Sequence, residues 1–371
     1  ILIRWGNLIT HAFGHLALNT ELYLCERDRQ VNRPRQKYVD LPFFGDSLVS
    51  NTYLLRMWKR VIKTYPASPL KAIVWVNNII PGGAAHNIGF NANDRDILNL
   101  MAGSKPHLSF TDEEEERGRR FLESLGITNG TPYICLNVRD SAYYKAIDAS
   151  NARHAFRDSS IENYVLAAEA LVDRGFFVLR MGREVGAPLV SSRKEIVDYA
   201  HKRLGDEFLD LYLGAKCYMC LSSGSGFDAI PALFRRPVSF VNYLPAETPN
   251  SSQTYLVYVS KGHFDIKTGK QLTFREIVSR NVATRVSPEA YIKNGISLKE
   301  NSAEEILDVA VEAVERLQGT WITDPVGETL QGQFREIMPL SLPGRKVPLH
   351  GEIFIRYSEN YLKKNPWWVE R

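Results

Sequence analysis

The stretch KCYMCLSSGSGFDAIPALFRRPVSFVNY, residues 216–243, decides the fold. Its apolar runs KCYMCL (216–221) and PVSFVNY (237–243) have the composition of strands that are buried on both faces of a parallel sheet. Between them, FDAIPALF (227–234) is helical in composition, and a turn of Ser and Gly precedes it. Strand, turn, helix and strand in this order predict parallel α/β structure.

The same alternation extends over most of the chain from residue 126. PYICLNV (132–138) and FFVLRMG (176–182) are two more predicted strands. SIENYVLAAEALVDRG (160–175) has apolar residues at helical spacing, and SSRKEIVDYAHKRLG (191–205) has the start and stop signals of another helix. Buried strands that alternate with helices predict a doubly wound α/β domain.

The first part of the sequence is less regular. ILIRWGNLI (1–9) and KYVDLPFF (37–44) could be strands, whereas residues 14–25, 51–62 and 69–79 look helical or mixed. This region could form a second α/β domain.

Two capping boxes mark the limits of the domains. Thr111 and Glu114 form the first box, at the start of a helix that ends near Gly126, and this helix is a natural end for a first domain. Ser302 and Glu305 form the second box, at the start of a late helix of the second domain. We therefore predict three segments: 1–128, 129–340, and a C-terminal linker and helix, 341–371, that packs back on the first domain.

Composition limits the classes of function. A net charge of +4 over 371 residues, with no isolated block of Lys and Arg, argues against a nucleic-acid surface and suits a small anionic ligand. No apolar run approaches the roughly 20 residues of a transmembrane helix. The four cysteines Cys25, Cys135, Cys217 and Cys220 are too scattered for a disulfide framework, so we expect buried thiols in a reducing compartment.

Polar residues follow three predicted strands at their carboxyl ends, where doubly wound sheets bind ligands. They are Arg139 and Asp140 after the first strand, Arg180, Gly182 and Arg183 at the end of the second, and Ser222, Ser223, Gly224, Ser225 and Gly226 after the third. Arginine binds phosphate oxygens through charge-assisted hydrogen bonds, and a Ser/Gly turn that opens a helix offers N–H and hydroxyl donors. We therefore predict a phosphate or diphosphate site here.

A structural role is the alternative for each of these residues. Ser and Gly also cap helices and form tight turns, although capping requires one serine rather than three. Arginines at strand ends also form ordinary surface ion pairs. The sequence leaves both readings open.

Other ligand motifs do not fit. A nucleophile elbow around Ser225 would need glycines where Ser223 and Phe227 stand, and no G-x-G-x-x-G follows a strand. Asp94 and Asp96 form a D-x-D, which some metal-dependent sugar transferases use to hold a cation, but we expect these aspartates to open a helix. The eight histidines lack ligand spacing, so we expect no bound metal.

Two further segments are candidates for the acceptor side. His154 and Arg157 lie in a long connection where a lid, or a plain basic loop, would be placed. His15, Asn19 and Glu21 lie in the first strand-to-helix region, where a His or Glu that faces an interdomain cleft could act as a general base. An ordinary helix N-terminus is the alternative.

These residues lie within a resemblance that runs over nearly the whole chain. GHLALNTELYL, SNTYLLRMWKR, CLNVRDSAYY, YLGAKCYMCLSSGSGFDAIPALF and NSAEEILDVAVEAVERLQGTW resemble a family of bacterial glycosyltransferases found with surface-polysaccharide genes. More distantly, an Arg at one strand end and a Ser-rich turn at a later one are similar to GDP-fucose-dependent fucosyltransferases, although Asn137 stands where their His-x-Arg pattern has histidine.

The resemblance implies a GT-B architecture, in which two Rossmann-like domains face a cleft and bind the acceptor and the nucleotide sugar. It implies metal-independent, inverting transfer of a hexosyl or deoxyhexosyl group from a nucleoside-diphosphate sugar to a hydroxyl of a glycan or other acceptor, without a cofactor. The expected location is the cytoplasm, or the cytoplasmic surface of the inner membrane. Arg139 and residues 222–226 would stabilise the leaving diphosphate, and His15, ranked before Glu21 and Asp140, would deprotonate the acceptor.

Two other functions suit the same residues. A sugar-nucleotide epimerase or hydrolase could use the same scaffold and phosphate site. A non-catalytic protein that binds a glycan or nucleotide is the other alternative.

Overall fold

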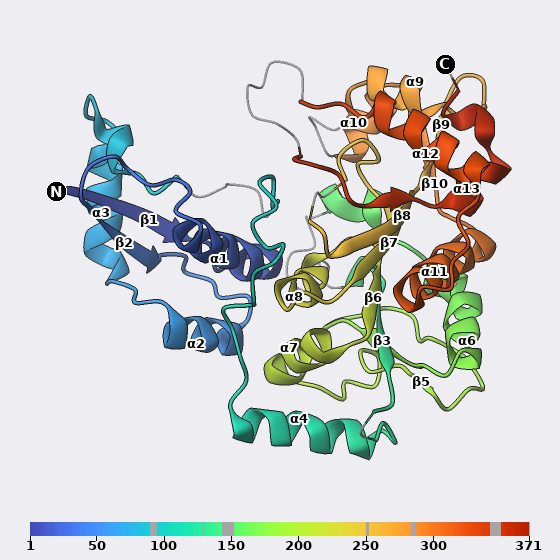
Figure 1. The fold of residues 1–371 in the computed structure, drawn as a ribbon, viewed down its shortest axis with the longest axis horizontal. Helices are drawn as coiled ribbons and strands as arrows, with labels where there is room; N and C mark the ends of the chain where they lie inside the picture. Colours follow the sequence, from blue (N-terminus) through green and yellow to red (C-terminus); the bar gives the residue numbers. More distant parts are fainter. Residues whose placement is uncertain are drawn as a thin grey trace.

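The computed structural model describes residues 1–89, 95–128, 130–142, 152–249, 252–282, 287–341 and 350–370. The chain forms two parts that lie side by side (Figure 1). The first contains a two-stranded parallel sheet and the second a seven-stranded parallel sheet. The fold class is therefore α/β, as predicted.

The seven strands follow the order β11-β8-β7-β6-β3-β4-β5. They are β3 (Tyr133–Asn137), β4 (Phe177–Met181), β5 (Ile196–Val197), β6 (Met219–Ser222), β7 (Val238–Tyr243), β8 (Tyr255–Ser260) and β11 (Arg356–Tyr357). From β3 the chain adds β4 and β5 on one side and β6, β7 and β8 on the other, so the order reverses between β3 and β6. The four strands predicted in this region are confirmed.

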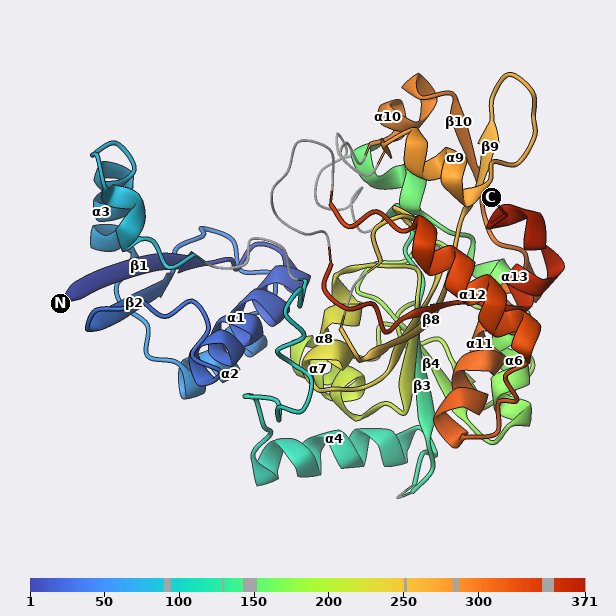
Figure 2. The same ribbon diagram turned by 45° about the horizontal axis from the view of Figure 1, so that its top comes forward.

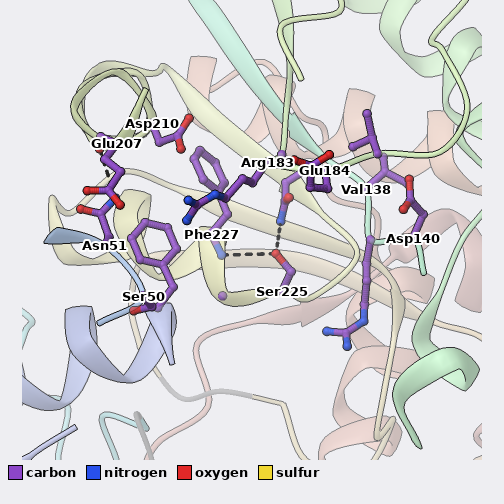
Figure 3. Close-up of a pocket in the computed structure, with 16 residues that line it drawn as sticks. Ser50, Asn51, Val138, Asp140, Arg183, Glu184, Glu207, Asp210, Ser225 and Phe227 are labelled. Carbon is purple, nitrogen blue, oxygen red and sulfur yellow. Dashed lines mark hydrogen bonds between the residues drawn. The ribbon is translucent and has the colours of Figure 1, made fainter. Parts of the chain in front are cut away.

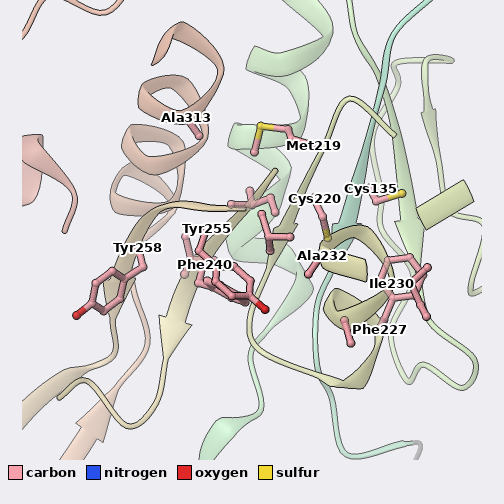
Figure 4. Close-up of a cluster of buried hydrophobic side chains, with 14 of the residues drawn as sticks. Cys135, Met219, Cys220, Phe227, Ile230, Ala232, Phe240, Tyr255, Tyr258 and Ala313 are labelled. Atoms are coloured by element: carbon pink, nitrogen blue, oxygen red, sulfur yellow. The ribbon is translucent and has the colours of Figure 1, made fainter. Parts of the chain in front are cut away.

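Helices cover both faces of this sheet because its central strands are apolar on both sides. They are α6 (Val165–Asp173) and α11 (Ala303–Gln318) on one face, and α7 (Glu207–Lys216) and α8 (Ala229–Leu233) on the other (Figures 1 and 2). In Figure 4, Cys220 of β6 lies close to Ala232 of α8. The four cysteines are buried and free, as predicted.

The first part is built on β1 (Leu2–Leu8) and β2 (Tyr38–Phe44), which pair in parallel along their whole length. Its helices are α1 (Phe13–Asp28), α2 (Thr52–Val61) and α3 (Ala67–Asn77). These elements confirm the strands and helices expected here. Since α1 follows β1 and packs on α8, while α2 follows β2 and packs on α7, the carboxyl ends of both strands face the second part.

The two parts are joined by α4 (Asp112–Ser124), which begins with the predicted capping box of Thr111 and Glu114. The predicted box of Ser302 and Glu305 likewise begins α11. The remaining elements are η1 (Gly83–His86), η2 (Ala152–Arg157), η3 (Ile161–Tyr164), η4 (Gly226–Asp228), η6 (Pro366–Trp368), the antiparallel pair β9 (Gly262–Asp265) and β10 (Ile296–Lys299), α9 (Phe274–Ser279), α10 (Pro288–Lys293), α12 (Pro325–Ile337) and α13 (Glu359–Lys364). Within the described ranges, no helix has the length and hydropathy needed to cross a bilayer.

The helix predicted over residues 191–205 is wrong. This segment forms the short strand β5 and turns, with Val197 paired to Leu179 of β4. The Asp198 carboxylate accepts hydrogen bonds from the Leu189 amide (2.6 Å) and Arg180 (3.2 Å). These nonlocal contacts override the helical spacing of the sequence.

The C-terminal segment also differs from expectation. β11 extends the large sheet beside β8, and α13 packs on α11 and α12. The segment therefore completes the second part. It contacts the first 128 residues at Gly351, which lies against the Ile97 carbonyl. The helix expected in this segment begins at Glu359. The buried Glu359 carboxylate accepts a hydrogen bond from Arg316 (2.9 Å), which fixes the segment there.

Only the second aspartate of the D-x-D motif lies within the described residues. Asp94 lies outside the described residues, and Asp96 does not open a helix. Its buried carboxylate accepts hydrogen bonds from the amides of Leu100 (2.6 Å) and Met101 (2.8 Å), so it closes a turn instead.

Candidate functional site

A pocket of about 180 Å³ lies between the two parts, at the carboxyl ends of β3 and β4 and beside the turn that follows β6 (Figure 3). Its lining is Phe13, Ser50 and Asn51 from the first part, and Asn137, Val138, Arg139, Asp140, Gly182, Arg183, Glu184, Val185, Glu207, Asp210, Ser225, Gly226 and Phe227 from the second. The pocket therefore adjoins the switch point of the large sheet, where α/β proteins bind their ligands.

The pocket gathers some predicted site residues and leaves others out. Those that line it are Arg139, Asp140, Gly182, Arg183, Ser225 and Gly226. Those that do not are His15, Asn19, Glu21, Arg157, Arg180, Ser222, Ser223 and Gly224. The side chain of His154 is outside the described part of the chain.

The serine-rich turn after β6 is held by its own hydroxyl groups. Asn137 at the end of β3 donates to the hydroxyls of Ser222 (3.0 Å) and Ser225 (2.8 Å). The fully buried Ser222 hydroxyl donates to Asp228 (3.0 Å) and accepts from the Gly224 amide (3.0 Å). These contacts occupy the Ser222 hydroxyl, so it shapes the turn and faces no ligand.

Ser223 and Arg157 brace the same turn. The Ser223 hydroxyl accepts a hydrogen bond from the Arg139 amide (2.8 Å), and Arg157 donates to the Gly224 carbonyl (2.8 Å). Gly224 has φ +80°, a conformation that favours glycine. The helix that follows consists of η4 and the five-residue α8, so the helix-dipole contribution expected from a long helix is small.

Arg180 does not line the pocket but forms ion pairs behind its wall. Its buried guanidinium pairs with Asp198 (3.2 Å) and lies 3.7 Å from the Asp140 carboxylate. Asp140 also accepts hydrogen bonds from the amides of Ala142 (2.8 Å) and Gly186 (2.9 Å). These contacts engage both oxygens of Asp140 and fix its carboxylate in place.

Two arginines carry the positive charge of the pocket wall. Arg139 is buried, with its Nε 3.6 Å from the Asp158 carboxylate. Arg183 is exposed, and Figure 3 shows its side chain between Phe227 and the carboxylates of Glu207 and Asp210. No described residue is hydrogen-bonded to the Arg183 guanidinium, which leaves its donors available to a ligand.

Asp210 and Glu207, at the start of α7, are pocket residues that the sequence reasoning missed. Asp210 accepts a hydrogen bond from the Tyr199 hydroxyl (2.8 Å), and burial raises the pKa of Asp210 to about 6. Glu207 accepts hydrogen bonds from the amides of Thr52 (2.9 Å) and Tyr53 (3.2 Å) at the N-terminus of α2. The helical start signal of Asp206 could have located both.

The first part contributes the opposite wall through a close contact of two glycines. A side-chain carbon added at Gly226 would lie 3.2 Å from the Gly14 amide nitrogen and 3.4 Å from Phe13. The absence of a side chain at Gly226 therefore allows α1 to begin directly against the serine-rich turn. His15 follows on α1, with its Nδ1 3.4 Å from the Asn19 side chain, but it does not line the pocket.

Glu21 belongs to a buried ion cluster away from the pocket. Its carboxylate pairs with Arg235 (2.6 Å) and with His107 (3.1 Å), whose other ring nitrogen pairs with Asp28 (2.9 Å). The Cys25 thiol and these carboxylates raise the pKa of His107 to about 10. Glu21, Cys25 and His107 have metal-ligand spacing, but a protonated histidine and an adjacent guanidinium do not fit a cation site.

A second pair that the sequence reasoning missed stands at the strand ends of the first part. His11 follows β1, Asp46 follows β2, and His11 Nδ1 lies 2.9 Å from the Asp46 carboxylate. Burial raises the pKa of Asp46, but hydrogen bonds from Thr10, Asn7 and His11 outweigh it and lower that pKa to about 2. The strand-end rule used for the second part would have found both residues.

No family model and no curated protein matches this sequence. Among solved structures, the chain is similar to the glycosyl transferase family 9 protein from Veillonella parvula DSM 2008, with a TM-score of 0.47, 10% identity, and coverage of 85% of this chain and 97% of that chain. It is also similar to the E. coli ADP-heptose lps heptosyltransferase II, with a TM-score of 0.40, 12% identity, and coverage of 70% and 90%. A third is an E. coli heptosyltransferase with ADP-2-deoxy-2-fluoro heptose, with a TM-score of 0.31, 13% identity, and coverage of 70% and 93%. Since these TM-scores are below 0.5, the function proposed below rests on the pocket.

Proposed function

We propose that this protein is a glycosyltransferase that moves a sugar from a nucleoside-diphosphate sugar to a hydroxyl acceptor. The observation that carries the proposal is a pocket between two α/β parts, at the switch point of the larger sheet, with two arginines on one side and a His–Asp pair at the nearby strand ends of the other part. This arrangement supplies a site for an anionic leaving group and, across it, a base for an acceptor.

Arg139 and Arg183 are the proposed ligands of the diphosphate. As the bond to the sugar breaks, negative charge grows on the β-phosphate, and guanidinium donors fixed at that position stabilise the charge. This electrostatic stabilisation lets the proposed reaction proceed without a metal. The serines of the turn support it indirectly, because Ser223 fixes the Arg139 backbone.

Each of the four carboxylates of the pocket has a partner within the protein, which limits its repulsion of an anion at the arginines. Asp140 lies near Arg180 and accepts two amides, Glu207 caps α2, and Glu184 pairs with Arg203 (3.1 Å). Asp210, whose pKa burial raises to about 6, accepts a hydrogen bond from the Tyr199 hydroxyl and takes up a proton only as the pH falls toward 6. Carboxyl oxygens of this kind are suitable acceptors for sugar or ribose hydroxyls.

His11 is the proposed general base in place of His15, Glu21 and Asp140. The Asp46 carboxylate accepts a hydrogen bond from His11 Nδ1, and in the neutral imidazole this tautomer has a lone pair on Nε2 that can take an acceptor proton. His11 does not itself line the pocket, but it stands two residues before the pocket-lining Phe13, and its side chain is 56% exposed. Glu21 is fully buried in its ion cluster and cannot meet an acceptor.

In the proposed reaction, the acceptor oxygen bonds to the anomeric carbon while the bond from that carbon to the β-phosphate oxygen breaks. The acceptor proton passes to His11 Nε2, and the nucleoside diphosphate leaves. Attack opposite the leaving group inverts the anomeric configuration. We propose hexosyl or deoxyhexosyl transfer, and a location in the cytoplasm.

Thermal shift with ADP-, GDP-, UDP-, dTDP- and CMP-sugars, with and without Mg²⁺, tests the donor site. A ligand at about 100 times its Kd adds about 2.7 kcal/mol of stability, so binding raises the melting temperature. We expect one nucleotide class to act without Mg²⁺, and Arg183→Ala to remove the shift. Arg193→Ala, which removes an exposed arginine that pairs with Asp173 outside the pocket lining, is the matched control.

Two results contradict the proposal. If no sugar nucleotide shifts the melting temperature, the pocket is not a donor site. If the bound donor is converted or hydrolysed at turnover rates without an acceptor, the protein is an epimerase or hydrolase.

A further inference from the structure

The outer end of the first part exposes an apolar surface. Helix α3 packs lightly on β1 and β2, with Leu70 and Asn77 buried, while its opposite side carries Trp75 (70% exposed) and Val76 (48% exposed). The turn after the helix adds Ile79 (66% exposed) and Ile80 (52% exposed). Large exposed apolar side chains gathered on one helix mark an interaction surface.

Two strand residues at the same end of the first part are also exposed. Ile3 of β1 and Val39 of β2 are direct strand partners, and both are nearly half exposed. Figures 1 and 2 both show α3 and the start of β1 at the end of the first part that is remote from the second part. We call Ile3, Val39, Trp75, Val76, Ile79 and Ile80 the apolar tip.

Basic side chains border the apolar tip. Arg33, Arg35 and Lys37 are exposed in the loop that leads into β2, and the Lys37 carbonyl accepts a hydrogen bond from the Leu2 amide (2.8 Å), which places the loop beside the start of β1. A groove lined by Ile1, Val39 and these three basic residues joins the two kinds of surface. We call Arg33, Arg35 and Lys37 the basic rim.

The first 89 residues, which form β1, β2 and the helices α1 to α3, differ in charge from the rest of the chain. Residues 1–89 contain 11 Lys and Arg against 5 Asp and Glu, a net charge of +6, whereas the whole chain has +4, so the remainder carries −2. From residue 47 to residue 93 the sequence has no Asp or Glu at all. The positive charge is therefore concentrated in the part that bears the apolar tip.

We propose that the apolar tip and the basic rim bind the surface of an anionic lipid bilayer. Trp and aliphatic side chains insert at the level of the headgroups, and nearby Lys and Arg are attracted to anionic lipids. A second copy of the chain is the less favourable occupant, since two tips that each belong to a part of charge +6 repel each other. The contact is peripheral and does not depend on the proposed transferase activity.

Flotation with lipid vesicles tests this proposal without any sugar nucleotide. The protein is mixed with vesicles of phosphatidylcholine, with or without about one quarter phosphatidylglycerol, at about 0.1 M and about 0.5 M salt. We expect binding to the anionic vesicles that weakens in high salt. Trp75→Ser combined with Ile79→Ser should lower the partition coefficient about tenfold or more, because apolar insertion is lost.

The basic rim is tested separately. Arg33→Gln, Arg35→Gln and Lys37→Gln together should lower binding about tenfold or more and remove most of its salt dependence. Controls on the second part are Ile322→Ser (Ile322 is 88% exposed) and Lys267→Gln with Lys270→Gln, which should bind like the unchanged protein. Trp75→Ser alone serves as a milder variant if the double variant fails to fold by circular dichroism.

Three outcomes would overturn the proposal. The first is no flotation of the unchanged protein with anionic vesicles. The second is equal binding by the tip variants and the controls. The third is self-association in sedimentation that the tip variants abolish, without vesicle binding, which would make the apolar tip an interface between copies.

Discussion

The Glu207 carboxylate of the second part accepts a hydrogen bond from the Thr52 amide of the first part at 2.9 Å. Glu207 thus caps α2 from the other side of the pocket, while the Asn51 side chain donates to the Glu207 carbonyl (3.2 Å). Asn51 and Glu207 both line the pocket. This contact between the two parts therefore also shapes the candidate site.

Replacing Glu207 should weaken this junction. We expect Glu207→Ala to cost about 1–2 kcal/mol in the free energy of unfolding, because the amides at the start of α2 lose their acceptor. Glu207→Gln keeps an oxygen acceptor and should cost less. Urea unfolding measures both, and equal stability of the two variants and the unchanged protein would show that the cap contributes nothing.

The His11–Asp46 pair should matter for turnover and not for donor binding. Once a donor is identified, we expect His11→Ala to lower kcat about 10²- to 10⁴-fold, since the acceptor loses its base. Asp46→Asn should lower kcat as well and alter the pH profile of kcat, because a neutral amide neither fixes the proton on His11 Nδ1 nor stabilises the imidazolium that forms. His15→Ala is the matched control, because His15 is, like His11, outside the pocket lining but has no carboxylate partner among the described residues, and a larger loss there would return the role to His15.

Asp210 should make stability depend on pH. Its folded pKa of about 6 lies above the ordinary value of 3.8, so the folded state binds this proton more tightly than the unfolded state. Stability should therefore fall by about 2–3 kcal/mol as pH rises from about 4 to about 6. Asp210→Asn should lack this loss and be more stable than the unchanged protein at pH 7, and chemical denaturation across this range measures it.

His107 should give a pH dependence in a higher range. Its folded pKa of about 10 is raised above 6.5 by Cys25, Glu21 and Asp28, so its stabilising contribution is complete below about pH 6.5 and is lost as pH rises toward 10. We expect a loss of a few kcal/mol over that range in the unchanged protein. His107→Gln should be less stable at pH 6 and should lose less between pH 6.5 and 10, and a parallel pH curve would exclude this role.

Local signals predicted much of the second part correctly. Apolar strands such as β3 and β7 and helices with capping boxes such as α4 and α11 are determined by residues that are close in sequence. The rule that ligands lie at strand ends located Arg139, Arg183 and Ser225 at the pocket. The rule could not predict which donors at those strand ends form hydrogen bonds within the protein and which remain for a ligand.

The sequence by itself determined the alternation of strands and helices, the buried cysteines and the strand ends at which a ligand would lie. Tertiary structure alone decided that Ser222 holds a turn while Arg183 is exposed, that Glu21 lies in an ion cluster with Arg235, and that His11 meets Asp46. The physical reason is that strand and helix formation depend on neighbours along the chain, whereas hydrogen-bond and charge pairing depend on residues brought together only by folding, 214 positions apart for Glu21 and Arg235.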